Sequence, residues 1–280
     1  STSKFPRWAV AYKFPATQST TQLLDIKVNV GKTGSINPYA ILEPINIGGV
    51  TVKQATLHNE SYIRTMELMI GDWVVVERAG EVIPKIVSVV TSKRNGTERY
   101  FDMPDTCPSC ETSIVHTPGE AMSYCNNASC SSQLARLLEH FISRDCMDIN
   151  GMGGKLGNKL ISYGLIKDVA DIYYLNQQVL IPMPNMAEKR ASNLINAIEN
   201  SKLKPLSKVI SSLGINLVGS QVAETLTRTF NSMDELIEAN EDDLTSIQGI
   251  GPKIATSIIE YFRNQDNYMV VRKLLDAGVG

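Results

Sequence analysis

The chain has 280 residues, which is long for one domain and suits several smaller ones. Hydrophobic residues make up 43% and charged residues 20%, a composition that excludes a disordered or collagen-like chain. No run approaches about 18 apolar residues and the first residues hold no apolar signal core, so neither a membrane span nor a secretion signal is expected. The net charge of −2 combines 12 basic and 8 acidic residues over 1–100 with 15 and 21 over the remainder. A protein that grips nucleic acid by bulk charge alone would be more basic.

Residues 1–100 have the pattern of a small β-barrel. Residues 23–30, 50–53 and 73–77 are short runs rich in β-branched and apolar residues, and glycines separate them. Short strands with a glycine at most corners suit a closed Greek-key barrel of about five strands, with a flat sheet as the alternative.

Four of the five cysteines lie within 24 residues. Cys107 and Cys110 form a CxxC pair, and Cys125 and Cys130 form a second pair after 14 further residues. Two such pairs close a tetrahedral S₄ site, for which structural Zn²⁺ is the default metal and an iron–sulfur cluster the alternative. The segment is too short to bury a core, so we expect zinc to hold it folded. Cys146 stands apart and is expected to be a small buried apolar residue.

From residue 133 the periodicity becomes helical. Leu134, Leu137, Leu138 and Phe141 are spaced i, i+3, i+4 and i+7, which is typical of one face of an amphipathic helix. The second half is therefore predicted to be all-α, with short helices joined by glycine-containing turns. The same periodicity recurs in residues 191–198, 222–230 and 254–262.

The helical half contains an internal repeat. Its clearest copy is IQGIGPKIA over residues 247–255, which has the helix–hairpin–helix signature of two glycines around an apolar residue and a small residue four positions later. The second-glycine positions of four copies are 153, 187, 219 and 251, a spacing of 32 to 34 residues. The copy around 185–187 lacks both glycines, so we expect it to be structural only. The glycines of the other three copies are Gly151 and Gly153, Gly219, and Gly249 and Gly251.

These glycines allow a tight turn whose N–H groups point outward just before a helix N-terminus. That arrangement forms an anion-binding site, and its usual ligands are DNA phosphate oxygens. Lys155 and Lys253 lie beside two of the turns and would add a charge contact, and Lys32 and Arg78 suit phosphate contact on a DNA-facing barrel surface. The alternative is that each turn only connects two helices, but four copies at regular spacing favour binding of the DNA backbone. Backbone donors would also let an acidic half-chain bind DNA.

The chain resembles the bacterial NAD-dependent DNA ligases. The resemblance is carried, in the family's order over essentially all 280 residues, by WAVAYKFPA, VGKTG, LEPI, ATLHN, IGD, RAGEVIP, the four-cysteine knuckle, MDINGMGGK and the hairpin repeats. It implies a multidomain α+β chain. Its expected parts are the tail of a nucleotidyltransferase domain over 1–17, an OB-fold barrel over 18–96, a four-cysteine zinc finger over 97–133 and a helix–hairpin–helix domain over 134–280.

The resemblance also implies a function. Lys13 corresponds to the lysine of the last nucleotidyltransferase motif, which contacts the nucleotide phosphate, and the four cysteines match the zinc ligands. The full enzyme, with Mg²⁺, adenylylates a lysine from NAD, passes the AMP to the 5′-phosphate of a nick and joins the strands by attack of the 3′-hydroxyl. No KxDG sequence carries an AMP-accepting lysine here, and the family's NAD-binding and BRCT domains are missing. The chain is therefore expected to be the cytoplasmic, DNA-clamping part of a ligase, without catalytic residues and inactive alone.

Two other functional classes stay open. The chain would also suit a non-ligase DNA-binding module of a repair nuclease, although such a module need not carry the barrel, the knuckle and WAVAYKFPA in this order. A zinc-stabilised scaffold that binds only proteins is the second class. Salt-dependent binding to nicked duplex DNA would separate that scaffold from both DNA-binding interpretations.

Overall fold

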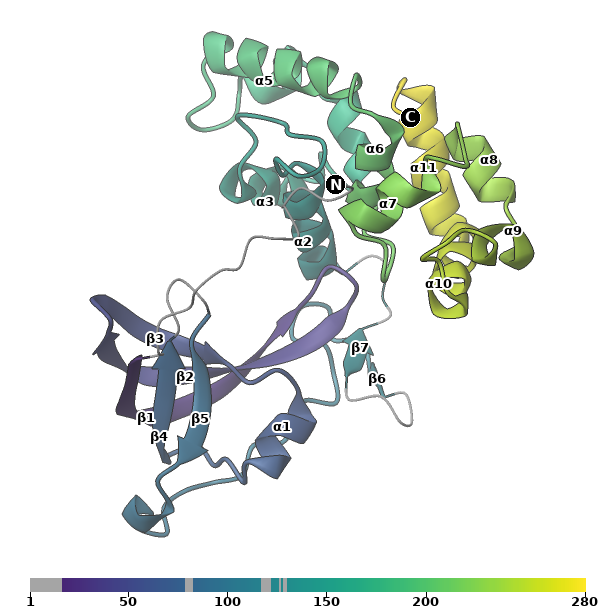
Figure 1. The fold of residues 1–280 in the computed structure, drawn as a ribbon. Helices are drawn as coiled ribbons and strands as arrows, with labels where there is room; N and C mark the ends of the chain where they lie inside the picture. The colour runs from purple at the N-terminus through teal and green to yellow at the C-terminus, as the bar shows by residue number, and fades with distance from the viewer. Residues whose placement is uncertain (1–16, 79–82, 117–121, 126, 128–129) are drawn as a thin grey trace. The chain divides into compact units, whose positions relative to one another are not determined.

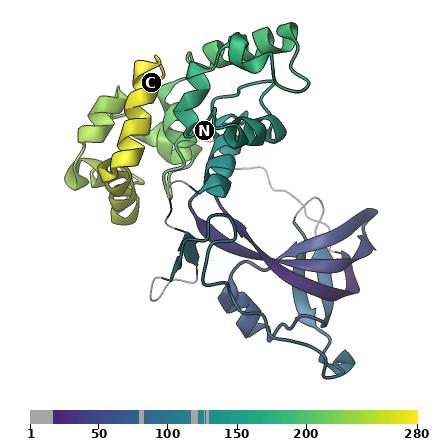
Figure 2. The same cartoon turned by 180° about the vertical axis from the view of Figure 1, so that it is seen from behind.

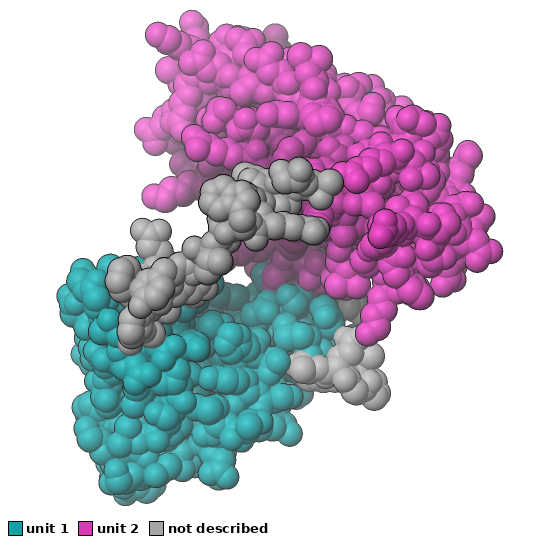
Figure 3. Space-filling view, in the orientation of Figure 1, with its two compact units in different colours: residues 1–30, 35–125 teal, residues 31–34, 126–280 magenta. Residues whose placement is uncertain are grey.

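The computed structural model describes residues 17–78, 83–116, 122–125, 127 and 130–280. The chain divides into two compact units, which Figure 3 colours separately. Unit 1 comprises Ser1–Val30 and Ser35–Cys125, and unit 2 comprises Gly31–Gly34 and Asn126–Gly280. No helix among the described residues is long and apolar enough to cross a membrane.

Unit 1 contains a closed five-stranded barrel (Figure 1). Antiparallel pairing joins β1 to β2 and β4, β2 to β3, and β4 to β5. A parallel bridge from Thr56 to Lys85 joins β3 to β5 and completes the ring. The Greek-key barrel is thus confirmed, and the flat sheet is wrong. The strands are β1 (Thr17–Val30), β2 (Ser35–Ile47), β3 (Val50–Thr56), β4 (Trp73–Arg78) and β5 (Lys85–Val89).

Shorter elements connect the barrel strands or extend the sheet. Helix α1 (Glu60–Thr65) joins β3 to β4, and its N-cap Asn59 accepts a hydrogen bond from the Tyr62 amide. A 3₁₀ turn, η1 (Thr91–Lys93), follows β5. Strands β6 (Ile114–His116) and β7 (Ser123–Cys125) form a small antiparallel hairpin, and β7 adds to the start of β2.

Alternation along the strands fills the barrel interior. Leu23, Val74 and Val76 are fully buried, as the inward positions of a small barrel require. The register of β1 shifts between Leu23 and Asp25, and this irregularity leaves Leu24 43% exposed outside the core.

A buried ion pair braces the barrel. The Asp72 side chain has no exposed area, and its carboxylate accepts hydrogen bonds from Arg94 Nε at 2.7 Å and Arg94 Nη2 at 2.8 Å. The Met69 amide donates to the same carboxylate at 2.8 Å. A buried carboxylate is tolerated only with such partners, so Asp72 and Arg94 fix the start of β4 against the segment after β5.

Unit 2 is helical, as predicted (Figures 1 and 2). Both views place α5 at one end of the unit and α8 with α9 at the other. One continuous core runs through it, from Leu138 on α2 to Val279 near the end of the chain. Its elements are α2 (Ser131–Phe141), α3 (Gly154–Ser162), η2 (Val169–Tyr174), α4 (Gln177–Leu180), α5 (Glu188–Ser201), α6 (Leu206–Ser212), α7 (Ser220–Leu226), α8 (Met233–Glu238), α9 (Glu241–Thr245), α10 (Pro252–Arg263) and α11 (Gln265–Asp276).

A polar contact joins the last helix to an early segment of this unit. Lys273 on α11 donates to Asp168 Oδ2 at 2.9 Å and to Asp171, and Asp168 also caps η2. Burial raises the pKa of Asp171, but the hydrogen bonds from Lys273 and from two backbone amides outweigh it, so its pKa lies below the usual range. The ionised pair therefore holds α11 against η2 at neutral pH.

Candidate nucleic-acid interface and metal centre

The four repeats form one kind of hairpin, numbered 1 (residues 149–153), 2 (183–187), 3 (215–219) and 4 (247–251). In each, the third residue adopts a left-handed backbone conformation, with φ of 91° at Gly151, 65° at Asn185, 62° at Leu217 and 95° at Gly249. The fifth residue is extended and is the N-cap of the next helix. These N-caps are Gly153 before α3, Ala187 before α5, Gly219 before α7 and Gly251 before α10.

Burial alternates in the same way along all four hairpins. The first and fourth residues face the core, as shown by Met152, Met186, Val218 and Ile250, which are 4–5% exposed. The second and third residues are exposed in every copy. The hairpin is therefore anchored by two apolar side chains while its tip faces solvent.

A small buried residue fixes the start of each following helix. The carbonyl of the N-cap accepts a hydrogen bond from the amide four residues later at 2.9–3.0 Å. At the first of these positions, a Cβ on Gly157 would meet Leu138 Cδ2 at 2.8 Å, so the helix packs closely there. The small residues are Gly157, Ala191, Ala223 and Ala255, and all are buried.

Hairpin 2 keeps the shape without either glycine. Asn185 takes the left-handed position, which asparagine tolerates, and its carbonyl accepts a hydrogen bond from Arg190 Nη1 at 2.8 Å. Ala187 occupies the extended N-cap with φ −81°. Glu188 begins the next helix, so an acidic residue occupies the position that Gly154 holds after hairpin 1 and Pro252 holds after hairpin 4.

The second glycine of the other hairpins is not required by the fold. At Gly153, Gly219 and Gly251 a Cβ would meet no atom within 4 Å. Their φ values of −95°, −95° and −88° suit any residue. The space beside these backbones is therefore open to an external group, and glycine allows such a group to approach most closely.

The cations predicted beside the hairpins are accessible. Lys155 and Lys253 lie in the first turns of α3 and α10 and are exposed. Each is two residues after its N-cap glycine. Their ammonium groups can therefore add charge to the backbone donors at the same two helix starts.

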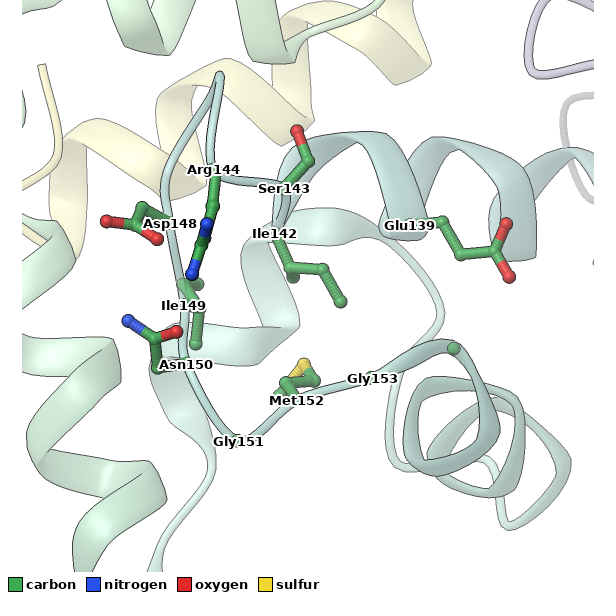
Figure 4. A pocket seen from close by; sticks show the side chains of 11 residues that line it. Glu139, Ile142, Ser143, Arg144, Asp148, Ile149, Asn150, Gly151, Met152 and Gly153 are labelled. Carbon is green, nitrogen blue, oxygen red and sulfur yellow. The ribbon is translucent and has the colours of Figure 1, made fainter. Parts of the chain in front are cut away.

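A cleft of about 400 Å³ lies beside hairpin 1 (Figure 4). Its lining includes Gly151 and Gly153, and the exposed Arg144 side chain extends towards the hairpin. Sequence reasoning missed Arg144, because a loop arginine after α2 belongs to no periodic or glycine pattern. Glu139 lines the other end of the cleft, close to Gly154.

The barrel cations are less open than the hairpin cations. Lys32 is half-buried, and burial lowers its pKa, although the electrostatic interaction with Cys146 partly offsets this. Arg78 ends the described part of β4 and is also half-buried. Lys13 lies outside the described residues.

The four predicted metal ligands lie together. The Sγ atoms of Cys107, Cys110, Cys125 and Cys130 are all within 4.8 Å of one another. Cys125 ends β7, while Cys130 is the N-cap of α2. Three of the four residues are buried, so the cluster brings four cysteine sulfur atoms together in a largely enclosed arrangement that suits a metal ion.

The fifth cysteine has polar neighbours. Cys146 is 2% exposed, as expected, but its Sγ lies 3.7 Å from His140 Nε2 and 3.9 Å from Ser211 Oγ. Burial raises the pKa of Cys146, yet hydrogen bonds from His140 and neighbouring serines outweigh it and lower the pKa overall. Because the thiol is enclosed, we interpret this contact as packing between α2 and α6.

Comparison with known proteins identifies the barrel and the helical repeats. Residues 20–98 match the OB-fold domain of NAD-dependent DNA ligases. Residues 143–200 match a tandem helix–hairpin–helix family, which covers hairpins 1 and 2, and residues 208–271 match a helix–hairpin–helix motif family, which covers hairpins 3 and 4. Similar curated proteins include the DNA ligase of Syntrophus aciditrophicus, which is 49% identical over 99% of this chain. The DNA ligase of Halothermothrix orenii is 49% identical over 100% of this chain.

The chain belongs to the NAD-dependent DNA ligase family. It spans 41% and 42% of the length of these two relatives. The DNA ligase of Thermoanaerobacter sp. strain X514 is 47% identical over 99% of the chain and is covered to 42%. The family assignment made from the sequence motifs is thereby confirmed.

The geometry of hairpin 4 makes a prediction about its two glycines. Gly249→Ala should lower the free energy of unfolding by about 1 kcal/mol, because alanine is strained at φ 95°. Gly251→Ala should be close to neutral, because its Cβ meets nothing and alanine restricts the unfolded chain, which offsets the poorer N-cap that alanine makes. Denaturant unfolding measures both. Equal losses would show that the second glycine is also needed for folding.

Proposed function

We propose that this chain is the DNA-gripping part of an NAD-dependent DNA ligase and binds nicked duplex DNA through its phosphates. The observation that carries the proposal is the empty space at Gly153, Gly219 and Gly251, where the fold itself would accept a side chain. Glycine at such positions is explained by a group that approaches the backbone from outside. A phosphate at the start of a helix, next to outward N–H groups, fits that space.

Hairpins 1 and 4 are the strongest phosphate sites. Each combines a left-handed glycine, Gly151 or Gly249, with an open N-cap glycine and a nearby exposed lysine, Lys155 or Lys253. Hairpin 3 has the open N-cap glycine Gly219, but the first turn of the helix that follows it holds no lysine. Such contacts position the duplex without reading its sequence, as sealing of nicks at any sequence requires.

The first test compares hairpin 4 with hairpin 2. Gly251→Val should weaken binding to a nicked duplex about tenfold or more, because a charge-assisted hydrogen bond is lost while no positive charge is removed. The dependence of affinity on salt should stay the same. Lys253→Ala should instead reduce the salt slope by about one unit.

The control is Ala187→Val in hairpin 2, which should leave DNA affinity unchanged. Binding isotherms by fluorescence anisotropy at several salt concentrations give both quantities. If Ala187→Val and Gly251→Val lose the same affinity, the hairpins act only through packing.

The barrel and the tail complete the proposal. Lys32 and Arg78 are proposed phosphate contacts of the OB-fold domain, and Lys13 is proposed to contact the nucleotide phosphate in the intact enzyme. NAD and Mg²⁺ belong to the reaction of that enzyme, which we place in the cytoplasm. The described residues supply grip on the duplex, which positions the ends of a nick for chemistry carried out by other domains.

Zinc is the proposed metal of the cysteine cluster. Four thiolates in one pocket suit Zn²⁺, which prefers tetrahedral sulfur ligands in structural sites. All four ligand positions come from protein residues, so the ion would be structural. The short β6–β7 hairpin has little core of its own, and metal binding would supply its folding free energy.

Loss of one ligand should release the metal. Cys125→Ser should bind less than one zinc per chain and unfold the knuckle locally, because structural zinc contributes about 10 kcal/mol in small fingers. Cys146→Ser, outside the cluster, should keep one equivalent. Metal analysis and limited proteolysis follow the two effects. Full zinc occupancy in Cys125→Ser would contradict the assignment.

The chain alone should not react with NAD, since it contains no KxDG lysine. After incubation with NAD and Mg²⁺, intact-mass spectrometry should show no gain of one AMP. Addition of the family's N-terminal domains, supplied as a separate chain, should restore sealing of a nicked duplex. A stoichiometric AMP adduct on the isolated chain would overturn this part of the proposal.

A further inference from the structure

Leu217 has an unusual backbone conformation. Its φ of 62° lies in the left-handed region, which is disfavoured for residues with a Cβ. The other non-glycine residues with positive φ in the described part of the chain are histidine, asparagine, aspartate and glutamate residues. Leu217 is the apolar residue among them. It therefore occupies a position where glycine would relieve backbone strain.

The fold does not bury this side chain. Leu217 is 54% exposed, although Ile215 and Val218 on either side of the tip are 3% and 4% exposed. The turn is held by other groups, because the Val218 amide donates to the Ile215 carbonyl at 3.1 Å and Ser257 Oγ donates to the Asn216 carbonyl at 2.7 Å. Internal packing therefore does not explain a leucine here.

The position of Leu217 in the repeat points to its partner. It is the third residue of hairpin 3, equivalent to Gly151 and Gly249 in the hairpins proposed to hold phosphates. The tips share the same left-handed conformation and the same exposure. A side chain at this position stands beside whatever the hairpin backbone contacts.

We propose that Leu217 inserts into the minor groove of duplex DNA and packs against deoxyribose and base edges next to the phosphates held by the hairpins. Other minor-groove proteins also place apolar side chains such as leucine in that groove, where they insert between base steps. The contact contributes by burial of apolar area and needs no particular base. The inference rests on the proposed DNA-binding function and deepens it by naming an apolar contact.

The test separates affinity from stability. Leu217→Gly and Leu217→Asn both suit a left-handed backbone, so neither should lower the melting temperature of the chain. Both should weaken binding to a fluorescent nicked duplex about five- to tenfold, through lost burial of the leucine side chain. The salt slope should not change, because no cation is removed. Leu217→Met, which keeps an apolar side chain, should bind within about twofold of the unchanged chain.

Leu203 provides a matched control. It is 86% exposed, lies between α5 and α6, and belongs to no hairpin. Leu203→Gly should bind within about twofold of the unchanged chain. Unchanged affinity in Leu217→Gly and Leu217→Asn would overturn the inference, and so would an equal loss in Leu203→Gly or in Leu217→Met.

Gly251→Val, measured in parallel, separates this inference from the proposed function. If Gly251→Val weakens binding but the Leu217 variants do not, only the apolar contact is wrong. If the unchanged chain fails to bind the duplex, both proposals are wrong. A loss in both sets, with the salt slope preserved, supports both.

Discussion

The helical unit depends on one packing constraint, repeated four times: two apolar residues that pack against the core flank an exposed pair. In hairpin 3, for example, Ile215 and Val218 are buried while Asn216 and Leu217 face solvent. In these hairpins the two anchors reach the same core through a tight turn between them. The turn has positive φ at its third residue, as a type II turn does. The direction of the next helix and the exposure of its first amides follow from that turn.

This constraint explains which features of the hairpins the sequence could predict. Hairpins 1 and 4 were predictable because glycine marks both the turn and the helix start. Hairpin 2 carries neither signal, yet burial of Met183 and Met186 imposes the same turn on Asn185. Leu217 was not predictable for the same reason, since packing of its neighbours overrides its own conformational preference.

In the barrel, too, some strands could be predicted from the sequence and one could not. Residues 23–30, 50–53 and 73–77 were predicted from their apolar content, and they lie within β1, β3 and β4. The 13-residue strand β2 was missed as an element because Pro38 and Pro44 interrupt its pattern. The structure accommodates Pro44 within a register shift between Ile41 and Ile45, where regular pairing with β3 is suspended. The cysteine spacing, in contrast, predicted the four-thiol cluster directly, because metal ligation depends on residue type more than on the surrounding fold.

The four hairpins share a backbone conformation but differ in the charged groups beside their tips, and this difference bears on how an acidic half-chain would bind DNA as proposed. Backbone N–H donors carry no net charge. Acidic residues in unit 2 are therefore compatible with phosphate binding as long as they lie away from the hairpin tips. Hairpin 2 breaks that condition, because Glu188 occupies the start of its helix. Hairpin 4 keeps it and adds Lys253, whereas hairpin 1 adds Lys155 but has the Glu139 carboxylate close to Gly154. The repeat thus keeps the packing in every copy while the charges beside its tips differ, and hairpin 4 is the copy that best suits the proposed contact with DNA.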